Sequence, residues 1–368
     1  MNLNILIRKL FLTVIFLGLI NSCKKTDLNT ESSAFSSTLF TLLESDVTGI
    51  DFLNEVKNQK NFNIFKYRNF YNGGGVAIGD INNDGLADIY FTGNMVANKL
   101  YLNKGNLSFE DISESAGIEG NKPWSTGVVM VDINQDGLLD IYVSNAGNLK
   151  GNNHDNDLYI NNGDLTFTEK AAEYNLAKTG FSTHASFFDY DKDGDLDAYI
   201  LNNSNIPVSS LGYAEQRDKR AQDWENVPQI FRGVGDMLLR NDNGKFVDVS
   251  EQAGIYGSLI GFGLGVMVTD MNGDLYPDIY VSNDFYERDY LYINNQDGTF
   301  KEDITNWTSH LSLSAMGVDI ADINNDGNAD IFITDMLPEA DQRVKSVMEF
   351  EGYNVFKLKQ SKDFSQQY

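Results

Sequence analysis

The chain has 368 residues, with 53 Asp and Glu against 28 Lys and Arg, a formal net charge of −25 and one cysteine. A hydrophobic fraction of 42% is enough for a buried core, so a wholly disordered chain is excluded. The acidity argues against a nucleic-acid-binding surface, because phosphates are bound by Lys and Arg. A single cysteine excludes an intrachain disulfide framework and a zinc site built from several cysteines.

The first 22 residues have the pattern of a secretory signal peptide. Arg8 and Lys9 precede the apolar run LFLTVIFLGLI, which is too short to span a bilayer. Cys23 follows where a bacterial lipoprotein carries its acylated residue, although Asn21 departs from the usual lipobox. We therefore expect a signal peptide over 1–22 and a lipidated Cys23 that begins a polar tether over 23–45. The predicted location is the bacterial cell envelope, at the outer membrane or the cell surface; the alternative is an ordinary secretory peptide with an incidental cysteine.

One nine-residue pattern, Asp-x-Asn/Asp-x-Asp-x-x-x-Asp, recurs five times, and we number its copies loops one to five. They are DINNDGLAD from Asp80, DINQDGLLD from Asp132, DYDKDGDLD from Asp189, DMNGDLYPD from Asp270 and DINNDGNAD from Asp322. Polar turns explain a single copy but not five copies with one internal spacing. The loops hold 17 of the 53 acidic residues, so about a third of the acidity is concentrated in them.

The internal spacing predicts a calcium loop. Oxygen side chains at positions one, three, five and nine, with the backbone carbonyl of position seven, can converge on a cation that takes about six to eight oxygen ligands. A glycine at position six allows a sharp turn in four copies, whereas loop four has Leu275 there and is the least certain. About five Ca²⁺ sites are therefore predicted, with the ligand positions Asp80, Asn82, Asp84, Leu86, Asp88, Asp132, Asn134, Asp136, Leu138, Asp140, Asp189, Asp191, Asp193, Asp195, Asp197, Asp270, Asn272, Asp274, Tyr276, Asp278, Asp322, Asn324, Asp326, Asn328 and Asp330.

Other metal sites fit these loops less well. An EF-hand needs a bidentate glutamate at position twelve, which is Phe, Val or Ile in every copy, and helical flanks, whereas these flanks have the pattern of strands. Mg²⁺ demands stricter octahedral geometry, and transition metals favour His or Cys, which the loops lack.

Each loop lies between two β-rich runs. In four units a third such run follows and ends in asparagine, and an Asn/Asp/Gly turn then leads to a phenylalanine. The asparagines are Asn103, Asn161, Asn241 and Asn294, and the phenylalanines are Phe109, Phe167, Phe246 and Phe300. Four antiparallel strands repeated along the chain predict an all-β fold, a β-propeller of four-stranded blades. Five residues before each loop stands a glycine, at Gly75, Gly127, Gly265 and Gly317, with His184 as the exception.

The combination of GVxxxDxNxDGxxDIYxxN, LYxNxG and FxDxSExAGI resembles FG-GAP/VCBS repeats, as in integrin α-chain propellers. It is closer still to bacterial lipoproteins similar to cartilage acidic protein (the ASPIC/UnbV-associated type), and it extends over about residues 46–340. The resemblance implies a calcium-loaded β-propeller, commonly seven-bladed, that is exposed on the cell surface and serves recognition and adhesion. Loop four departs from the family pattern through Leu275.

Three segments remain outside the regular repeat. No further LYxN strand follows Asp330, so we expect the propeller to be incomplete and residues 341–368 to begin another blade or a linker. Residues 203–235 lengthen the interval between loops three and four and predict an insertion, either a binding element or a solvated decoration. Residues 46–74 are candidates for outer strands that close the propeller.

These patterns favour a non-catalytic, calcium-binding surface lipoprotein that recognises an extracellular protein or glycan and no nucleic acid. The alternatives are an enzyme on a propeller scaffold that acts on polysaccharide, and a scaffold domain of a longer protein. No catalytic residue is assigned, because His154, His184 and His310 belong to no recognisable triad. The tryptophans Trp124, Trp224 and Trp307 fit either sugar stacking or core packing.

Overall fold

The computed structural model describes residues 40–147, 154–204, 219–220, 233–257, 259–285 and 287–336, with the single positions 217, 342, 357 and 361 and the pair 366–367. The chain forms two compact units, Met1–Glu44 and Ser45–Tyr368, and the fold below is that of the second. The predicted signal peptide, Cys23, Trp224 and most of the segments 23–45, 203–235 and 341–368 lie outside the described residues. Within the described residues, no helix has both the length and the apolarity needed to cross a membrane.

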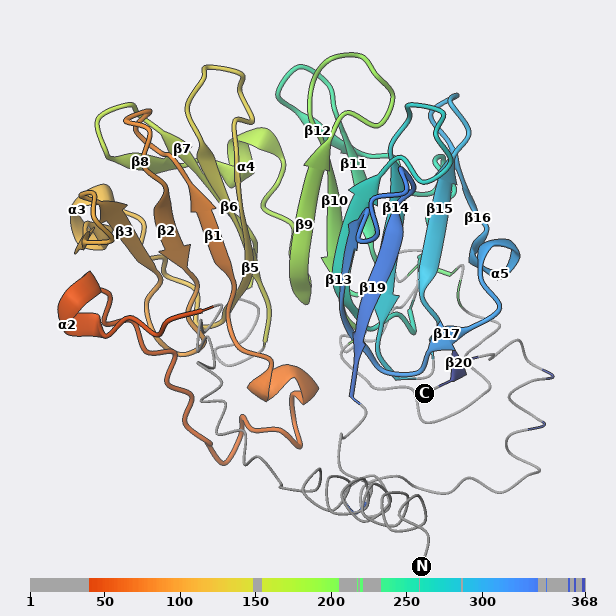
Figure 1. The fold of residues 1–368 in the computed structure, drawn as a ribbon, viewed down its shortest axis with the longest axis horizontal. Coiled ribbons are helices and arrows are strands. Elements are labelled where there is room, and N and C mark those ends of the chain that lie inside the picture. The colour runs from red at the N-terminus through yellow and green to blue at the C-terminus, as the bar shows by residue number, and fades with distance from the viewer. Residues whose placement is uncertain are drawn as a thin grey trace, which may run out of the picture. The chain divides into compact units, whose positions relative to one another are not determined.

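Four antiparallel sheets of four strands each follow one another along the chain (Figure 1). Blade one contains β1 (Val76–Gly79), β2 (Asp88–Phe91), β3 (Lys99–Asn103) and β4 (Phe109–Asp111); blade two contains β5 (Ser125–Val131), β6 (Asp140–Asn145), β7 (Asp157–Asn161) and β8 (Phe167–Glu169). Blade three contains β9 (Ser182–Phe188), β10 (Asp197–Asn202), β11 (Met237–Asn241) and β12 (Phe246–Asp248); blade four contains β13 (Gly263–Thr269), β14 (Asp278–Asn283), β15 (Tyr290–Asn294) and β16 (Phe300–Glu302). Within the described residues, blade five consists of the pair β18 (Ala315–Ala321) and β19 (Asp330–Asp335). The predicted order of first strand, acidic loop, second strand, third strand, turn and fourth strand is confirmed in blades one to four.

The few helices in the described residues are single turns, so the fold is nearly all β. They are α2 (Ser45–Thr48), η2 (Arg68–Tyr71), α3 (Ser113–Ala116), α4 (Ala171–Tyr174) and α5 (Ile304–Trp307), and a short strand β17 (Leu311–Ser312) pairs in parallel with β20 (Gln366–Gln367). Residues 46–74 hold α2 and η2 and add no strand to any sheet, so the closing outer strands considered for that segment are not formed. Phe62, Tyr67 and Phe70 of this segment instead pack around Trp124, which is 1% exposed and therefore part of the core.

Successive blades pack against each other through one repeated arrangement of third-strand and fourth-strand side chains. The third-strand leucine of each blade, such as Leu100 in β3, faces the next blade. It belongs to one buried cluster with a third-strand residue of that blade and the phenylalanine that begins its fourth strand, here Tyr159 and Phe167. The same arrangement joins Leu158 to Leu239 and Phe246, and Leu238 to Tyr292 and Phe300. These side chains are buried, and burying each contributes about 1.5–3 kcal/mol to stability.

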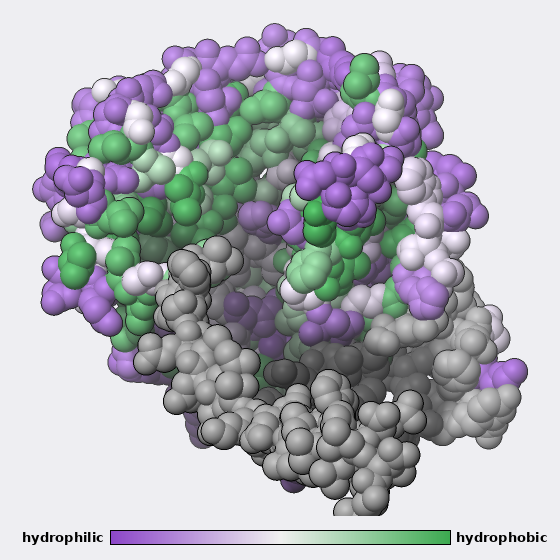
Figure 2. Space-filling model, viewed as in Figure 1, coloured by the Kyte–Doolittle hydropathy of each residue, from purple (hydrophilic) through white to green (hydrophobic). Residues whose placement is uncertain are grey.

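The first strands β1, β5, β9, β13 and β18 lie next to one another in chain order, and glycine permits their close approach. A Cβ atom on Gly127 would lie 2.4 Å from the carbonyl oxygen of Thr183 in the neighbouring first strand. His184, which occupies the glycine position in β9, lines an open cavity of about 710 Å³ together with Gly75 and Gly127. The acidic loops lie together at one end of the blades (Figure 1), and Figure 2 shows mainly hydrophilic surface along this upper rim.

Candidate metal centre

The first aspartate of each loop folds back over the turn and accepts backbone N–H groups. In loop one, Asp80 accepts hydrogen bonds from the N–H of Asp84 at 3.1 Å and of Gly85 at 2.7 Å. Asp132, Asp270 and Asp322 accept the two equivalent bonds, whereas Asp189 accepts only that of Gly194. In all five loops the position-five carboxylate accepts the N–H of position seven, in the pairs Asp84–Leu86, Asp136–Leu138, Asp193–Asp195, Asp274–Tyr276 and Asp326–Asn328. Hydrogen bonds between backbone N–H groups and carboxylates of the same loop thus determine the conformation of its turn.

In blades one to four, the ninth-position aspartate lies at the base of the loop and connects the loop to the third strand. The Oδ2 atom of Asp140 accepts the N–H of Ile133 at 3.1 Å, and its Oδ1 atom accepts the N–H of Asn161 at 2.8 Å. Asp88, Asp197 and Asp278 make the same two bonds and, like Asp140, are at most 1% exposed. Sequence reasoning assigned these residues to metal alone. Each carboxylate offers about four lone-pair sites, so ligation remains compatible with this structural role.

The asparagine that ends the third strand is a site residue that sequence reasoning missed. The Nδ2 atom of Asn161 donates to the carbonyl of Ile81 at 2.8 Å, and that of Asn294 donates to the carbonyl of Tyr190 at 2.9 Å. Both carbonyls belong to position two of the loop in the preceding blade. The repeated LYxN pattern was the available signal, but one sequence does not show which blade the amide contacts.

In loops one to three, the side chain at position four contacts the next loop. Asn83 donates from Nδ2 to the carbonyl of Gly137 at 3.0 Å, and Gln135 donates from Nε2 to the carbonyl of Gly194 at 3.0 Å. Lys192 then places its Nζ atom 4.6 Å from the ring centroid of Tyr276 in loop four. Loop four has a glycine, Gly273, at this position and therefore no side chain to continue the series.

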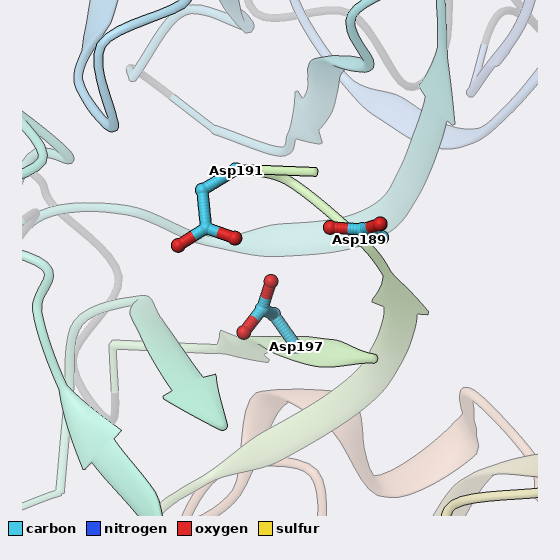
Figure 3. Close-up of side chains that lie close together, drawn as sticks. All are labelled: Asp189, Asp191 and Asp197. Atoms are coloured by element: carbon cyan, nitrogen blue, oxygen red, sulfur yellow. The ribbon is translucent and has the colours of Figure 1, made fainter. Parts of the chain in front are cut away.

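Loop three brings three carboxylates together (Figure 3). One oxygen from each of Asp189, Asp191 and Asp197 lies within 4.8 Å of the others, and the three side chains point into a common space between the end of β9 and the start of β10. The Oδ1 atoms of Asp189, Asp191 and Asp195 are buried without a hydrogen-bond partner. Buried oxygens normally have partners, so this loop has the chemistry that a hard cation such as Ca²⁺ satisfies. Within the described residues, no other group of three acidic, histidine or cysteine side chains converges in this way.

Electrostatics in loop three reflect this crowding. Burial, together with the smaller effect of the charges of Asp191 and Asp195, raises the pKa of Asp197 to about 7, although the backbone hydrogen bonds from Asn241 and Tyr190 lower it. Burial and the neighbouring aspartates likewise raise the pKa of Asp195 to about 6. Both shifts show that the ionised carboxylates repel one another in a poorly solvated place, so a positive charge placed among them would lower both pKa values.

Loop four keeps the common geometry despite its sequence. Leu275, at the glycine position, adopts φ 70°, and its N–H donates to Asp270 at 2.8 Å as the glycines do in the other loops. A side chain in the left-handed region costs about 1–2 kcal/mol. The leucine side chain is 76% exposed, so it obstructs no packing.

The histidines lie apart from one another and have separate surroundings. His154 is buried, contacts the carbonyl of Gly180 and stacks on Phe181 with ring centroids 5.2 Å apart, which is a structural role. Burial lowers the pKa of His184 in the cavity between the first strands. His310 is exposed and contacts the hydroxyl of Ser309 at 2.9 Å.

Comparisons with known proteins agree with this architecture. A family model described as an FG-GAP-like repeat matches residues 80–143, 146–200 and 270–333. Cartilage acidic protein 1 of Xenopus tropicalis is 33% identical over 217 residues, which cover 58% of this chain and 29% of that protein. Cartilage acidic protein 1 of Mus musculus is 26% identical over 216 residues, which cover 57% of this chain and 29% of that protein. The chain thus spans about three tenths of the length of these relatives.

Two solved structures are more distant. A lectin of Agrocybe aegerita described as recognising non-reducing terminal N-acetylglucosamine is 19% identical, with a TM-score of 0.37, over 70% of this chain and 59% of that chain. The V. cholerae biofilm matrix protein Bap1 is 12% identical, with a TM-score of 0.34, over 67% of this chain and 30% of that chain. At these TM-scores neither likeness supports a conclusion.

Four-stranded antiparallel blades, each carrying an acidic loop between its first two strands, define a repeat protein of the β-propeller class. The chain is an FG-GAP repeat protein.

Proposed function

We propose that this chain is a non-catalytic, calcium-binding module for recognition or adhesion, held on the bacterial cell envelope by a lipid on Cys23. Its ligand would be an extracellular protein or glycan. The observation that carries the metal assignment is loop three, where buried carboxylate oxygens converge and lack hydrogen-bond partners. Asp189, Asp191 and Asp197 would hold the ion there, and the corresponding positions would do so in the other four loops.

A bound Ca²⁺ would supply two positive charges to a loop whose carboxylates otherwise repel one another. The chain's own residues hold the loop in place. The ninth aspartate connects it by a hydrogen bond to the third strand of its blade, and the third-strand asparagine connects that strand to the loop of the preceding blade. Calcium would therefore stiffen the rim that carries the loops, which is the exposed end available to a partner.

Calcium titration of the purified chain tests the metal assignment. Isothermal titration calorimetry should give about five equivalents of Ca²⁺, and the thermal unfolding midpoint should rise with free Ca²⁺ because the ion binds the native state. Mg²⁺ at the same concentration is the control and should bind more weakly. An unfolding midpoint that is the same in Ca²⁺ and in EGTA contradicts the proposal.

Recognition is tested by glycan and protein arrays probed in Ca²⁺ and in EGTA. The proposal predicts at least one saturable ligand whose binding is lost in EGTA and restored by added Ca²⁺. If every ligand binds equally in Ca²⁺ and in EGTA, the recognition surface does not depend on calcium and this part of the proposal is wrong. Lipidation is tested separately with Cys23→Ser, which should release the protein from the membrane fraction of the bacterial cell.

A further inference from the structure

Loop three differs from the other loops at positions three and seven, where it carries additional carboxylates. Position three is Asp191 in loop three and asparagine in the other four loops, and position seven is Asp195 instead of leucine, tyrosine or asparagine. Loop three therefore holds five carboxylates, whereas each of the other loops holds three. Its one basic residue, Lys192, places its Nζ atom over the ring of Tyr276 in loop four. The additional acidic charge is thus concentrated at two of the predicted ligand positions.

In loops one, two and four, the asparagine at position three donates a hydrogen bond to the position-five carboxylate. These bonds run from Nδ2 to Oδ2, at 3.0 Å in loop one and 2.9 Å in loops two and four, in the pairs Asn82–Asp84, Asn134–Asp136 and Asn272–Asp274. An amide donor stabilises an ionised carboxylate. In these loops part of the carboxylate charge is therefore compensated by the chain itself.

Loop three has no such compensation at position three, because the ionised carboxylate of Asp191 accepts hydrogen bonds and donates none. The Oδ1 atoms of Asp189, Asp191 and Asp195 are buried without a hydrogen-bond partner. One oxygen from each of Asp189, Asp191 and Asp197 lies within 4.8 Å of the others. Buried oxygens without partners and close like charges both cost free energy. Without an ion, loop three is therefore less stable than the other loops, and a bound cation would remove this cost.

We infer that the chain has two classes of calcium site, with loop three binding Ca²⁺ at least about tenfold more tightly than each of the other four loops, because the number of charged ligands tunes calcium affinity. This inference rests on the calcium binding proposed above. The additional carboxylates strengthen the bound form, and the missing hydrogen bonds weaken the ion-free form, so both effects favour binding to loop three. As the calcium concentration falls, the other four loops should release their ions first. Loop three would then be a structural site, and the weaker loops would make recognition respond to calcium.

Hydrogen exchange of the full chain, measured by mass spectrometry at a series of buffered free Ca²⁺ concentrations, follows each loop separately. Peptides that contain residues 189–197 should become protected at a free Ca²⁺ concentration at least about tenfold lower than peptides from the other four loops. The reason is that a bound ion suppresses local opening of the loop that holds it, and exchange reports that opening.

Reciprocal substitutions at position three test the cause. Asp191→Asn gives loop three the residue of the other loops, and it should raise the Ca²⁺ concentration that protects loop three toward that of the other loops. Asn134→Asp makes the reverse change in loop two, because it removes the donor to Asp136 and adds a carboxylate, and it should lower the concentration that protects loop two. Glu114→Gln is the control: it removes an exposed charge outside the loops and should leave all five protection midpoints unchanged.

The possible failures of this inference and of the proposed calcium binding are distinguishable. Protection of all five loops at one Ca²⁺ concentration, or of loop three only at a higher concentration than the others, overturns the inference and leaves calcium binding in place. An unshifted midpoint of loop three in Asp191→Asn also overturns it. If no loop gains protection in Ca²⁺, the calcium assignment itself is wrong, and the inference is wrong with it.

Discussion

The side chain of Gln135 in loop two donates a hydrogen bond of 3.0 Å to the carbonyl oxygen of Gly194 in loop three. This bond joins two sites that belong to different blades and are separated by 59 positions in the chain. Asn83 makes the corresponding bond one blade earlier. The loops are therefore not independent turns but members of a connected rim.

Gln135→Ala should lower the free energy of unfolding slightly, by no more than about 1 kcal/mol, because the lost bond is solvent-exposed. Asn325→Ala is the matched control: it stands at the same loop position with the same φ of 59°, and within the described residues its side chain makes no hydrogen bond to another loop. Urea unfolding of both variants measures the difference. Equal destabilisation would mean that the backbone conformation, and not the bond between loops, determines the effect.

Asp140→Asn should destabilise the chain by about 1–3 kcal/mol even in EGTA, since one of the two N–H groups it accepts would lose its partner in a buried place. The control, Asp136→Asn, changes an exposed carboxylate of the same loop and should cost less under the same conditions. Thermal unfolding in EGTA compares the two. If the two variants lose the same stability, the structural role assigned to the ninth-position aspartate is wrong.

Asp191→Asn should have opposite effects with and without calcium. In EGTA the substitution removes one charge from the crowded carboxylates of loop three and should raise the unfolding midpoint. In saturating Ca²⁺ it removes a proposed ligand and should lower the midpoint. Glu114→Gln removes one charge from the exposed side of α3 and should show no such reversal. The same sign of change in both conditions would count against a metal at this loop.

Asp289 predicts a pH dependence of stability. Burial raises its pKa to about 7 in the folded state, where it accepts hydrogen bonds from Asn283 and Tyr280. Because the folded state holds the proton more tightly than the unfolded chain, this contribution is complete below the ordinary aspartate pKa of about 4. It is lost as the pH rises through about 7.

Asp289→Asn isolates that contribution. In blade two the equivalent residue is already an asparagine, Asn156, which accepts from Asn145 and donates to Tyr142. The variant should therefore keep the hydrogen bonds, lose stability less steeply between pH 5 and 8, and exceed the wild type at pH 8. Parallel pH profiles of the two proteins would show that Asp289 does not carry a raised pKa.

Gly127→Ala tests the close approach of the first strands. The added Cβ atom would lie 2.4 Å from the backbone oxygen of Thr183, so a strand must shift, at a cost of about 1–3 kcal/mol. The control is Gly317→Ala, at the same repeat position in blade five, where the nearest atom is the Oγ1 of Thr334 at 3.4 Å. It should change stability by no more than about 0.5 kcal/mol. Chemical denaturation of both variants shows whether the close packing of the first strands or the change in backbone entropy from glycine to alanine determines the effect on stability.

The repeat and the alternation of apolar residues along the chain determined the strands, their order within a blade and the place of the acidic loops. These are local properties, because neighbouring strands in one sheet follow each other directly in sequence. The carboxylates of loop three lie within nine consecutive residues, so spacing alone was enough to bring them together.

Only the tertiary structure decided which contacts form between neighbouring blades. The destination of the Asn161 amide, the contact of Gln135 with loop three and the second role of Asp140 all depend on the rotation from one blade to the next. The structure also placed Trp124 in the core. These contacts join residues far apart in the chain, and no local pattern of charge or hydrophobicity specifies them. The sequence thus determined where the acidic charge is concentrated, and the blade packing decided how the loops are linked to one another.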